Sequence, residues 1–168
     1  MSLPPVHRVV TGHDAAGKAV VIADSKFESI PNPAGTALFT LVWTSQGMPV
    51  DNNDAFDGRE RDTDITLPGG SVIRVVDMLP GTTAPMHRTS SLDYGIVISG
   101  KIELILDDQA ATLVEPGGIV IQRGTIHSWR NPSADETARV AFVLIDAASV
   151  TVDGAPLEDI HPRLGRKP

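Results

Sequence analysis

Short apolar blocks separated by turn residues constrain the fold of this chain more than any other feature. From Ser71 onward, runs of four to nine residues rich in Val and Ile alternate with Gly and Pro turns; examples are SVIRVVDML, YGIVIS, KIELILD and RVAFVLID. This spacing leaves no room for the crossover helices of a parallel sheet and is typical of an antiparallel sandwich or barrel. We therefore predict an all-β protein, a single domain with the architecture of a small barrel or jelly roll.

Individual blocks give finer predictions. YGIVIS and IELILDD, joined at Gly100, predict a β-hairpin. ARVAFVLID lies in a stretch long enough for a helix, but its β-branched residues favour a strand. The weaker candidates HRVV, KAVVIA and ALFTLVWT near the N-terminus are expected to join the same sheet system or to reach a neighbouring subunit.

Composition excludes several classes of function. The net charge is −7, from 14 basic and 21 acidic residues, so nucleic acid and anionic membrane surfaces are not expected as partners. No apolar run approaches the ~18 residues that span a bilayer, and the N-terminus does not resemble a signal peptide, which predicts a cytoplasmic protein. Cysteine is absent, so any metal must be held by nitrogen and oxygen ligands.

An acidic segment, DNNDAFDGRERDTDIT (residues 51–66), carries six acids against two arginines. We interpret it as a solvated loop, with a lid over a cavity as the alternative. The chain then divides into three parts: residues 1–68, a barrel core at 69–150 and a tail at 151–168. The first part holds the N-terminal strands and this loop, and it is expected to pack on the barrel or on a partner.

Two segments place polar residues inside otherwise apolar strands. The first, between Gly81 and Gly100, contains His87, Thr89 and Asp93; the second, between Pro116 and Asn131, contains Gln122 and His127. Since side chains alternate along a strand, His87 and Thr89 share a face. A turn brings Asp93 back on the next strand, and His127 arrives from a third. The three ligand-type residues are therefore expected to point toward one interior position.

These two segments resemble the motifs of the cupin superfamily. Residues at the spacings of the first motif are Gly81, His87, Asp93 and Gly100; those of the second are Gly117, Gly124, His127 and Asn131. The match covers roughly residues 70 to 146 and implies a jelly-roll barrel, the double-stranded β-helix, and a homodimer. The chain departs from the family pattern where Thr89 replaces the second His, Asp93 replaces Glu and Gln122 replaces Pro.

The resemblance implies a metal site with His87, Asp93 and His127 as ligands and Thr89 in the vacant position. Two imidazoles and one carboxylate suit Fe, Mn, Ni or Zn, so the set does not name the divalent transition metal. The alternative is a metal-free network in which the carboxylate accepts hydrogen bonds from both imidazoles.

Three further residues are candidates for contacts with a substrate or a metal-bound water. Thr89 is suited to hydrogen-bond such a water. Gln122 is suited to orient a substrate or to satisfy backbone groups. Trp129 is suited to line the cavity or to pack in the core. The histidines outside the motifs are interpreted as surface residues: His7, His13 and His161.

The predicted function is a metal-dependent enzyme that acts on a small organic molecule. The resemblance is compatible with dioxygenase, decarboxylase, lyase or isomerase chemistry, and the residues do not choose among these. The alternative is a non-catalytic module that binds or senses a small molecule. The sequence offers no basic or helical segment through which a sensor would signal, which favours the enzyme.

Overall fold

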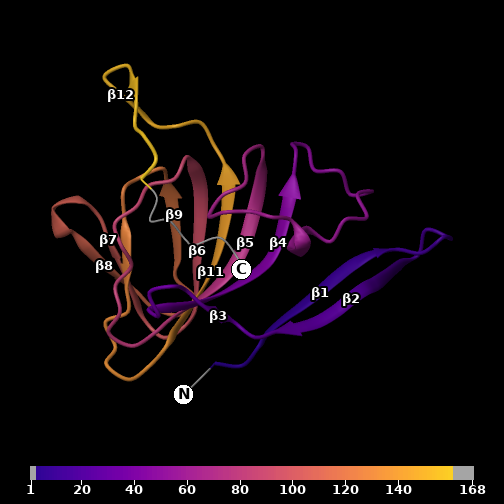
Figure 1. The fold of residues 1–168 in the computed structure, drawn as a ribbon, viewed down its shortest axis with the longest axis horizontal. Coiled ribbons are helices and arrows are strands. Elements are labelled where there is room, and N and C mark those ends of the chain that lie inside the picture. Colours follow the sequence, from indigo (N-terminus) through magenta and orange to yellow (C-terminus); the bar gives the residue numbers. More distant parts are fainter. Residues whose placement is uncertain (1–2, 161–168) are drawn as a thin grey trace.

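The computed structural model describes residues 3–160, whose regular secondary structure is almost wholly β-strand (Figure 1). Two single-turn 3-10 helices, η1 (Gly58–Glu60) and η2 (Asp107–Gln109), interrupt them. In chain order the strands are β1 (Val6–His13), β2 (Ala19–Phe27), β3 (Ile30–Pro31), β4 (Ala37–Gln46), β5 (Gly70–Met78), β6 (Ser91–Ser99), β7 (Ile102–Ile105), β8 (Ala111–Val114), β9 (Ile119–Arg123), β10 (Ser128–Arg130), β11 (Ala138–Asp146), β12 (Thr151–Val152) and β13 (Ala155–Pro156). No helix in the described part of the chain is long and apolar enough to cross a membrane.

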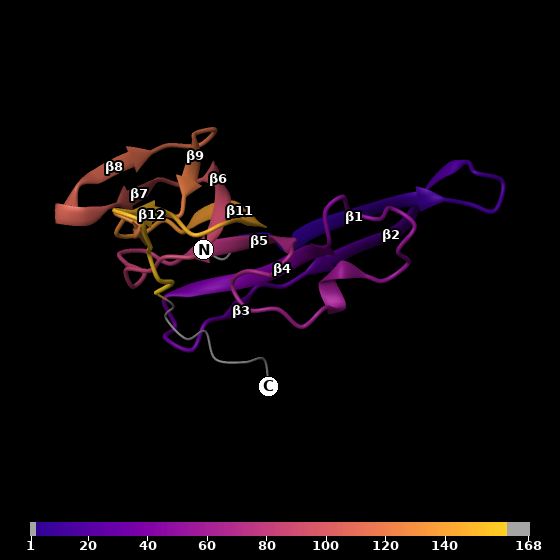
Figure 2. The ribbon, with the colours of Figure 1, turned by 90° about the horizontal axis from the view of Figure 1, so that it is seen from above.

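Two antiparallel sheets form the body of the molecule. The larger has the strand order β3-β4-β5-β11-β6-β9, and the smaller has the order β10-β7-β8 (Figures 1 and 2). This confirms the predicted all-β jelly-roll architecture. The predicted barrel is not closed by hydrogen bonds, because the two sheets remain separate ladders.

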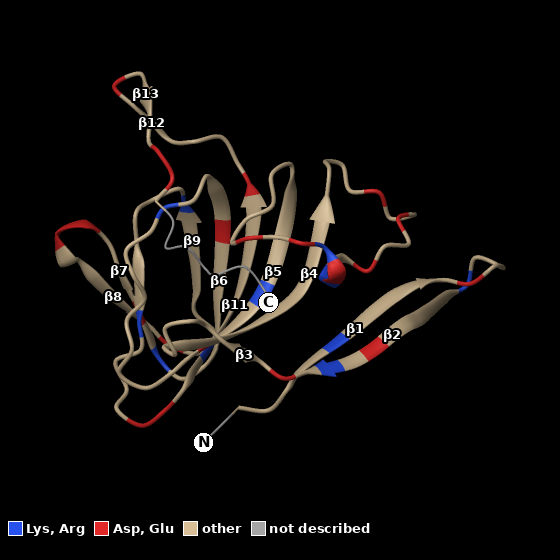
Figure 3. Ribbon diagram, in the orientation of Figure 1, with Lys and Arg blue, Asp and Glu red and all other residues tan. Residues whose placement is uncertain are grey.

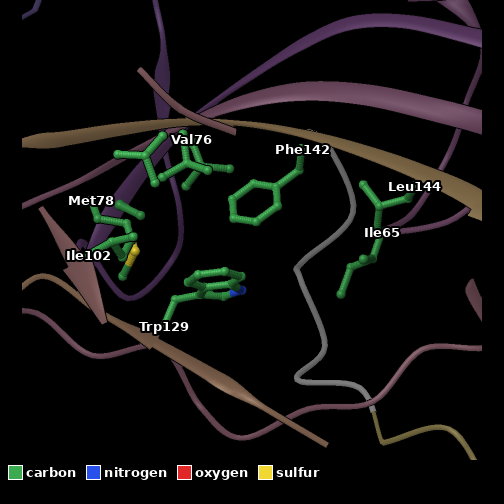
Figure 4. Close-up of a cluster of buried hydrophobic side chains, with 10 residues drawn as sticks. Ile65, Val76, Met78, Ile102, Trp129, Phe142 and Leu144 are labelled. Carbon is green, nitrogen blue, oxygen red and sulfur yellow. The ribbon is translucent and has the colours of Figure 1, made fainter. Parts of the chain in front are cut away.

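The hydrophobic core lies between the two sheets. Strand alternation on β11 buries every second residue, including Phe142, which faces Trp129 of β10 with ring centroids 5.3 Å apart (Figure 4). Met78 of β5 and Ile102 of β7 close the same cluster from opposite sheets. The edge-to-face contact between the rings of Phe142 and Trp129 joins the sheets.

The strand predicted from ARVAFVLID is confirmed as β11, but the hairpin predicted at Gly100 is wrong. β6 pairs with β11 and β9, whereas β7 pairs with β8 and β10. Gly100 has φ 71° and passes so close to Ala138 that a Cβ would lie 2.7 Å from its Cα. The turn therefore carries the chain from one sheet to the other instead of folding one strand back on its neighbour.

The acidic segment is only partly a solvated loop (Figure 3). Its first residues are exposed, but Gly58 is buried against β4, where Thr44 donates a hydrogen bond to its carbonyl. Asp57 accepts two hydrogen bonds from Arg8 of β1, at 2.7 and 2.8 Å. Ile65 belongs to the buried core. The end of the segment thus contributes Ile65 to the core, and the lid alternative stays a prediction.

Strands β1 and β2 form a hairpin, here called the arm (residues 6–27), that projects away from the two sheets (Figures 1 and 2). Of the N-terminal candidates, ALFTLVWT joins the large sheet as β4, while HRVV and KAVVIA pair with each other in the arm. The base of the arm contacts the body at two points. The guanidinium carbon of Arg8 lies 5.7 Å from the ring of Trp43, and that of Arg59 lies 3.9 Å from the ring of Phe27. Farther out, Ile22 is 62% exposed.

Part of the outer face of the large sheet is apolar. Four side chains stand in register across neighbouring strands, here called the outer row: Ile73, Val143, Tyr94 and Ile121. Ile121 is 52% exposed. The next register along the strands adds Ile119, which is more exposed still.

Candidate functional site

One cavity of about 380 Å³ opens on the inner side of the large sheet. All six residues singled out from the sequence line it: His87, Thr89, Asp93, Gln122, His127 and Trp129. Among the other histidines, His7 and His13 are exposed on the arm as predicted, while His161 lies outside the described residues.

His87 and His127 form a closely spaced pair. Their backbones exchange two hydrogen bonds of 2.8 and 2.9 Å in an isolated antiparallel bridge. The two ring centroids are 4.1 Å apart. The bridge fixes the backbones of both residues, and this places the two imidazole rings side by side at the cavity wall.

Both rings are oriented by backbone carbonyls two residues earlier in the chain. Nδ1 of His87 donates to the carbonyl of Pro85 at 2.9 Å, and Nδ1 of His127 donates to that of Thr125 at 3.0 Å. Burial, with a smaller contribution from the charge of His87, lowers the pKa of His127 to about 4. His127 is therefore neutral at pH 7, and its Nε2 carries a lone pair that can accept a proton or coordinate a metal.

Asp93 occupies a different part of the cavity wall. It is 5% exposed and stands opposite Gln122 on the neighbouring strand β9. Burial raises the pKa of Asp93 to about 6, against opposing effects of a Ser91 hydrogen bond and the charge of Arg74. Its Oδ1 is buried and accepts no hydrogen bond from the described residues.

The predicted ligands do not assemble as a set of three. Within residues 3–160, no group of three or more His, Cys, Asp or Glu side chains is placed to hold one metal ion. The histidine pair has the ring orientation that metal ligands use, but Asp93 does not complete it in this structure. Metal binding therefore stays a prediction.

The remaining predicted residues and one aromatic cluster shape the cavity. Thr89 shares a hydrogen bond of 2.8 Å with Ser91, so its hydroxyl is already engaged. The indole ring of Trp129 stands edge-on to the imidazole of His127, with centroids 6.1 Å apart. Trp129 thus has both of the roles considered for it, since it lines the cavity and packs in the core.

Two of the cavity residues that sequence reasoning missed bear on the chemistry of the site, Arg74 and Ile65. Arg74 of β5 lines the cavity and lies in the inward phase of its strand, two residues before Val76. A lone charged residue at an inward position of SVIRVVDML was the signal that could have found it. The sequence around Ile65 contains no such signal, because this residue lies in a loop without a periodic pattern of apolar residues.

Comparisons with known proteins identify the family of this chain. A cupin-domain family model matches residues 74–145. The chain is 38% identical over 160 residues to the Phomopsin biosynthesis cluster protein C' of Diaporthe leptostromiformis, covering 88% of this chain and 82% of that protein. It is 34% identical over 162 residues to the cupin-domain-containing oxidoreductase fogC of Aspergillus ruber, covering 93% of this chain and 80% of that protein.

A solved structure supports the same fold. The cupin domain of Cnp3 from Schizosaccharomyces pombe matches with a TM-score of 0.51 at 14% identity, over 83% of this chain and 87% of that one. At that identity the likeness concerns the fold alone. The cupin-domain family model and the relatives above, which align over most of the chain, establish that this protein belongs to the cupin family.

Proposed function

We propose that this cupin is a biosynthetic enzyme of the oxidoreductase type that acts on a small, mostly apolar organic molecule bound in the cavity. The observation that carries the proposal is the convergence of all six motif-derived residues on one cavity of about 380 Å³. That volume lies in the range of small-molecule sites, roughly 300–1,000 Å³.

The composition of the cavity wall and the named relatives both support this function. Apolar side chains such as Phe39, Val76 and Leu144 surround a few polar groups, which is the usual pattern where polar contacts orient an apolar substrate. Relatives from Aspergillus ruber and Hypocrea virens are named cupin-domain-containing oxidoreductases, and one from Diaporthe leptostromiformis is named for a biosynthesis cluster.

The function is tested by comparing metabolites of cells that carry or lack the gene. We expect the deletion strain to accumulate a compound that differs from the missing product by two hydrogens or one oxygen, as measured by mass spectrometry. Restoring the wild-type gene or a His13→Ala variant should reverse the change, because His13 lies exposed on the arm. The His127→Ala variant should not. Full rescue by His127→Ala would refute an enzymatic role for this cavity.

The non-catalytic alternative gives a different result in the same experiment. A binding or sensing module would leave every metabolite chemically unchanged, while the purified protein would still retain a ligand. Absence of any precursor in the deletion strain, combined with a ligand that co-purifies unaltered, would favour that alternative.

Metal dependence is a separate proposal, with Fe, Mn, Ni or Zn as the ion and His87, Asp93 and His127 as the predicted ligands, of which the structure pairs only the two histidines. We expect protein purified without chelator to contain close to one equivalent of a transition metal by mass spectrometry of the metal. His87→Ala and His127→Ala should lose it, whereas His13→Ala, a histidine removed from outside the cavity, should retain it. Wild-type protein that cannot be loaded with any of the four metals would rule out this part of the proposal.

We also propose that two copies associate through the arm and the outer row. An isolated two-stranded hairpin is only marginally stable in water, yet no other segment of residues 3–160 covers the distal arm (Figure 2). An eight-residue strand pair is ~26 Å long and offers roughly 260 Å² on one face. Two arm-on-sheet contacts related by a two-fold axis then bury on the order of 1,000 Å², near the lower limit for a specific interface.

A further inference from the structure

Arg74 is the one cavity residue whose charge the motif-derived site leaves unexplained. It stands on β5 between Val72 and Val76, in the phase that points inward, and it lines the cavity. A charged side chain inside an apolar wall is unfavourable unless it is paired or makes strong hydrogen bonds. The partners of its guanidinium therefore indicate what else it can bind.

The chain satisfies only part of the hydrogen-bonding capacity of Arg74. Its Nη2 donates to the carbonyls of Asp64 and Ile65, at 2.6 and 2.8 Å. A guanidinium has five N–H groups, so three donors remain. Nε is buried and donates to no group among the described residues, and Nη1 makes no hydrogen bond there either.

No carboxylate in the described chain forms an ion pair with Arg74. Asp64 and Asp93 act on it only at longer range. Burial lowers the pKa of Arg74 to about 10, which leaves the side chain protonated at neutral pH. The cavity therefore contains a fixed cation with unused donors and no direct counter-ion.

From this geometry we infer that Arg74 anchors the substrate by donating hydrogen bonds to a carbonyl or carboxylate oxygen on an otherwise apolar molecule. The inference rests on the proposed function, because it names the class of molecule that the cavity accepts. Arginine suits this role because its planar fork of donors matches the geometry of such oxygens. The loop carbonyls that hold Nη2 fix the guanidinium in place before the substrate arrives.

Three probes of nearly the same shape test the inference: p-toluate, p-methylacetophenone and p-cymene. The first carries a carboxylate, the second a carbonyl, and the third an isopropyl group in the same position. Their dissociation constants would be measured by equilibrium dialysis for the wild type, Arg74→Met and Arg74→Lys.

Arg74→Met should weaken binding of the oxygen-bearing probes by about 10- to 100-fold, the usual effect of losing a charge-assisted hydrogen bond. Binding of p-cymene should stay nearly constant, which shows that the wall has kept its shape without the bonds to Asp64 and Ile65. Arg74→Lys should recover part of the p-toluate affinity. If Arg74→Met weakens the binding of p-toluate alone, the group that Arg74 recognises is a carboxylate. If it weakens the binding of both oxygen-bearing probes, that group is a carbonyl oxygen.

Two results would overturn the inference. Equal losses for all three probes in Arg74→Met would mean that Arg74 only supports the loop. Unchanged affinities for all three would mean that it contacts no ligand, while the proposed function would stand because the cavity still binds small molecules. If the wild type bound none of the probes, the proposed function and the inference would fall together.

Discussion

Replacing Asp77 by alanine is expected to lower the free energy of unfolding by about 3–5 kcal/mol, because it leaves a largely buried arginine without its counter-charge. Asp77 is 2% exposed on β5 and accepts hydrogen bonds from Nε and Nη2 of Arg139 on β11, at 2.6 and 2.7 Å. The same arginine donates to the carbonyl of Pro4, so the pair also fastens the N-terminal segment to the sheet. For a domain of this size the melting temperature should fall by roughly 6–20 °C.

Urea denaturation followed by circular dichroism measures the effect. Two further variants show whether the loss of stability comes from the unpaired charge. The double variant Asp77→Leu/Arg139→Leu should lose much less stability than Asp77→Ala, because neither charge is then left unpaired. Glu103→Ala breaks the more exposed ion pair between Glu103 and Arg130, and it should shift the denaturation midpoint little. A double variant as unstable as the single one would show that packing, and not charge pairing, dominates at this position.

The all-β architecture and six of the cavity residues were predictable from the sequence because their signals are local. Alternation of side chains along short strands places His87 and Asp93 on inward faces, and the spacing of the glycines marks the turns between them. Those signals put the residues on one cavity wall. They do not fix distances, so the close approach of His87 to His127 and the separate position of Asp93 emerge only from the pairing of strands.

The wrong hairpin and the arm have a common cause. Consecutive strands usually neighbour each other, and that rule predicts that β6 and β7 pair. The close approach of Gly100 to Ala138 that directs the chain into the other sheet involves residues far apart in sequence. Likewise, the pattern of VHRVVTGH indicates a strand but carries no information about which strand it pairs with, and the prediction left open whether it joined the main sheet.

Changing one exposed isoleucine on either contact surface is expected to convert a dimer into a monomer. Ile22→Lys places a charge on the arm and Ile121→Lys places one in the outer row, so each buries an unpaired ammonium in the proposed interface. Such a change should raise the dimer dissociation constant by at least about 100-fold. Leu113→Lys is the matched control, since Leu113 is 50% exposed, close to the 52% of Ile121, but lies on β8 of the smaller sheet.

Mixing the two variants tests whether the arm of one copy lies on the sheet of the other. A dimer of either variant alone has no intact arm-on-sheet contact. In the Ile22→Lys dimer both arms are altered, and in the Ile121→Lys dimer both outer rows are altered. In a mixture, the unaltered arm of the Ile121→Lys copy can bind the unaltered outer row of the Ile22→Lys copy. Sedimentation velocity should therefore show a mixed dimer at concentrations where each variant alone is monomeric. A wild type that is monomeric at the highest accessible concentration, or a mixture that stays monomeric, would contradict this arrangement, as would a Leu113→Lys variant that dissociates equally.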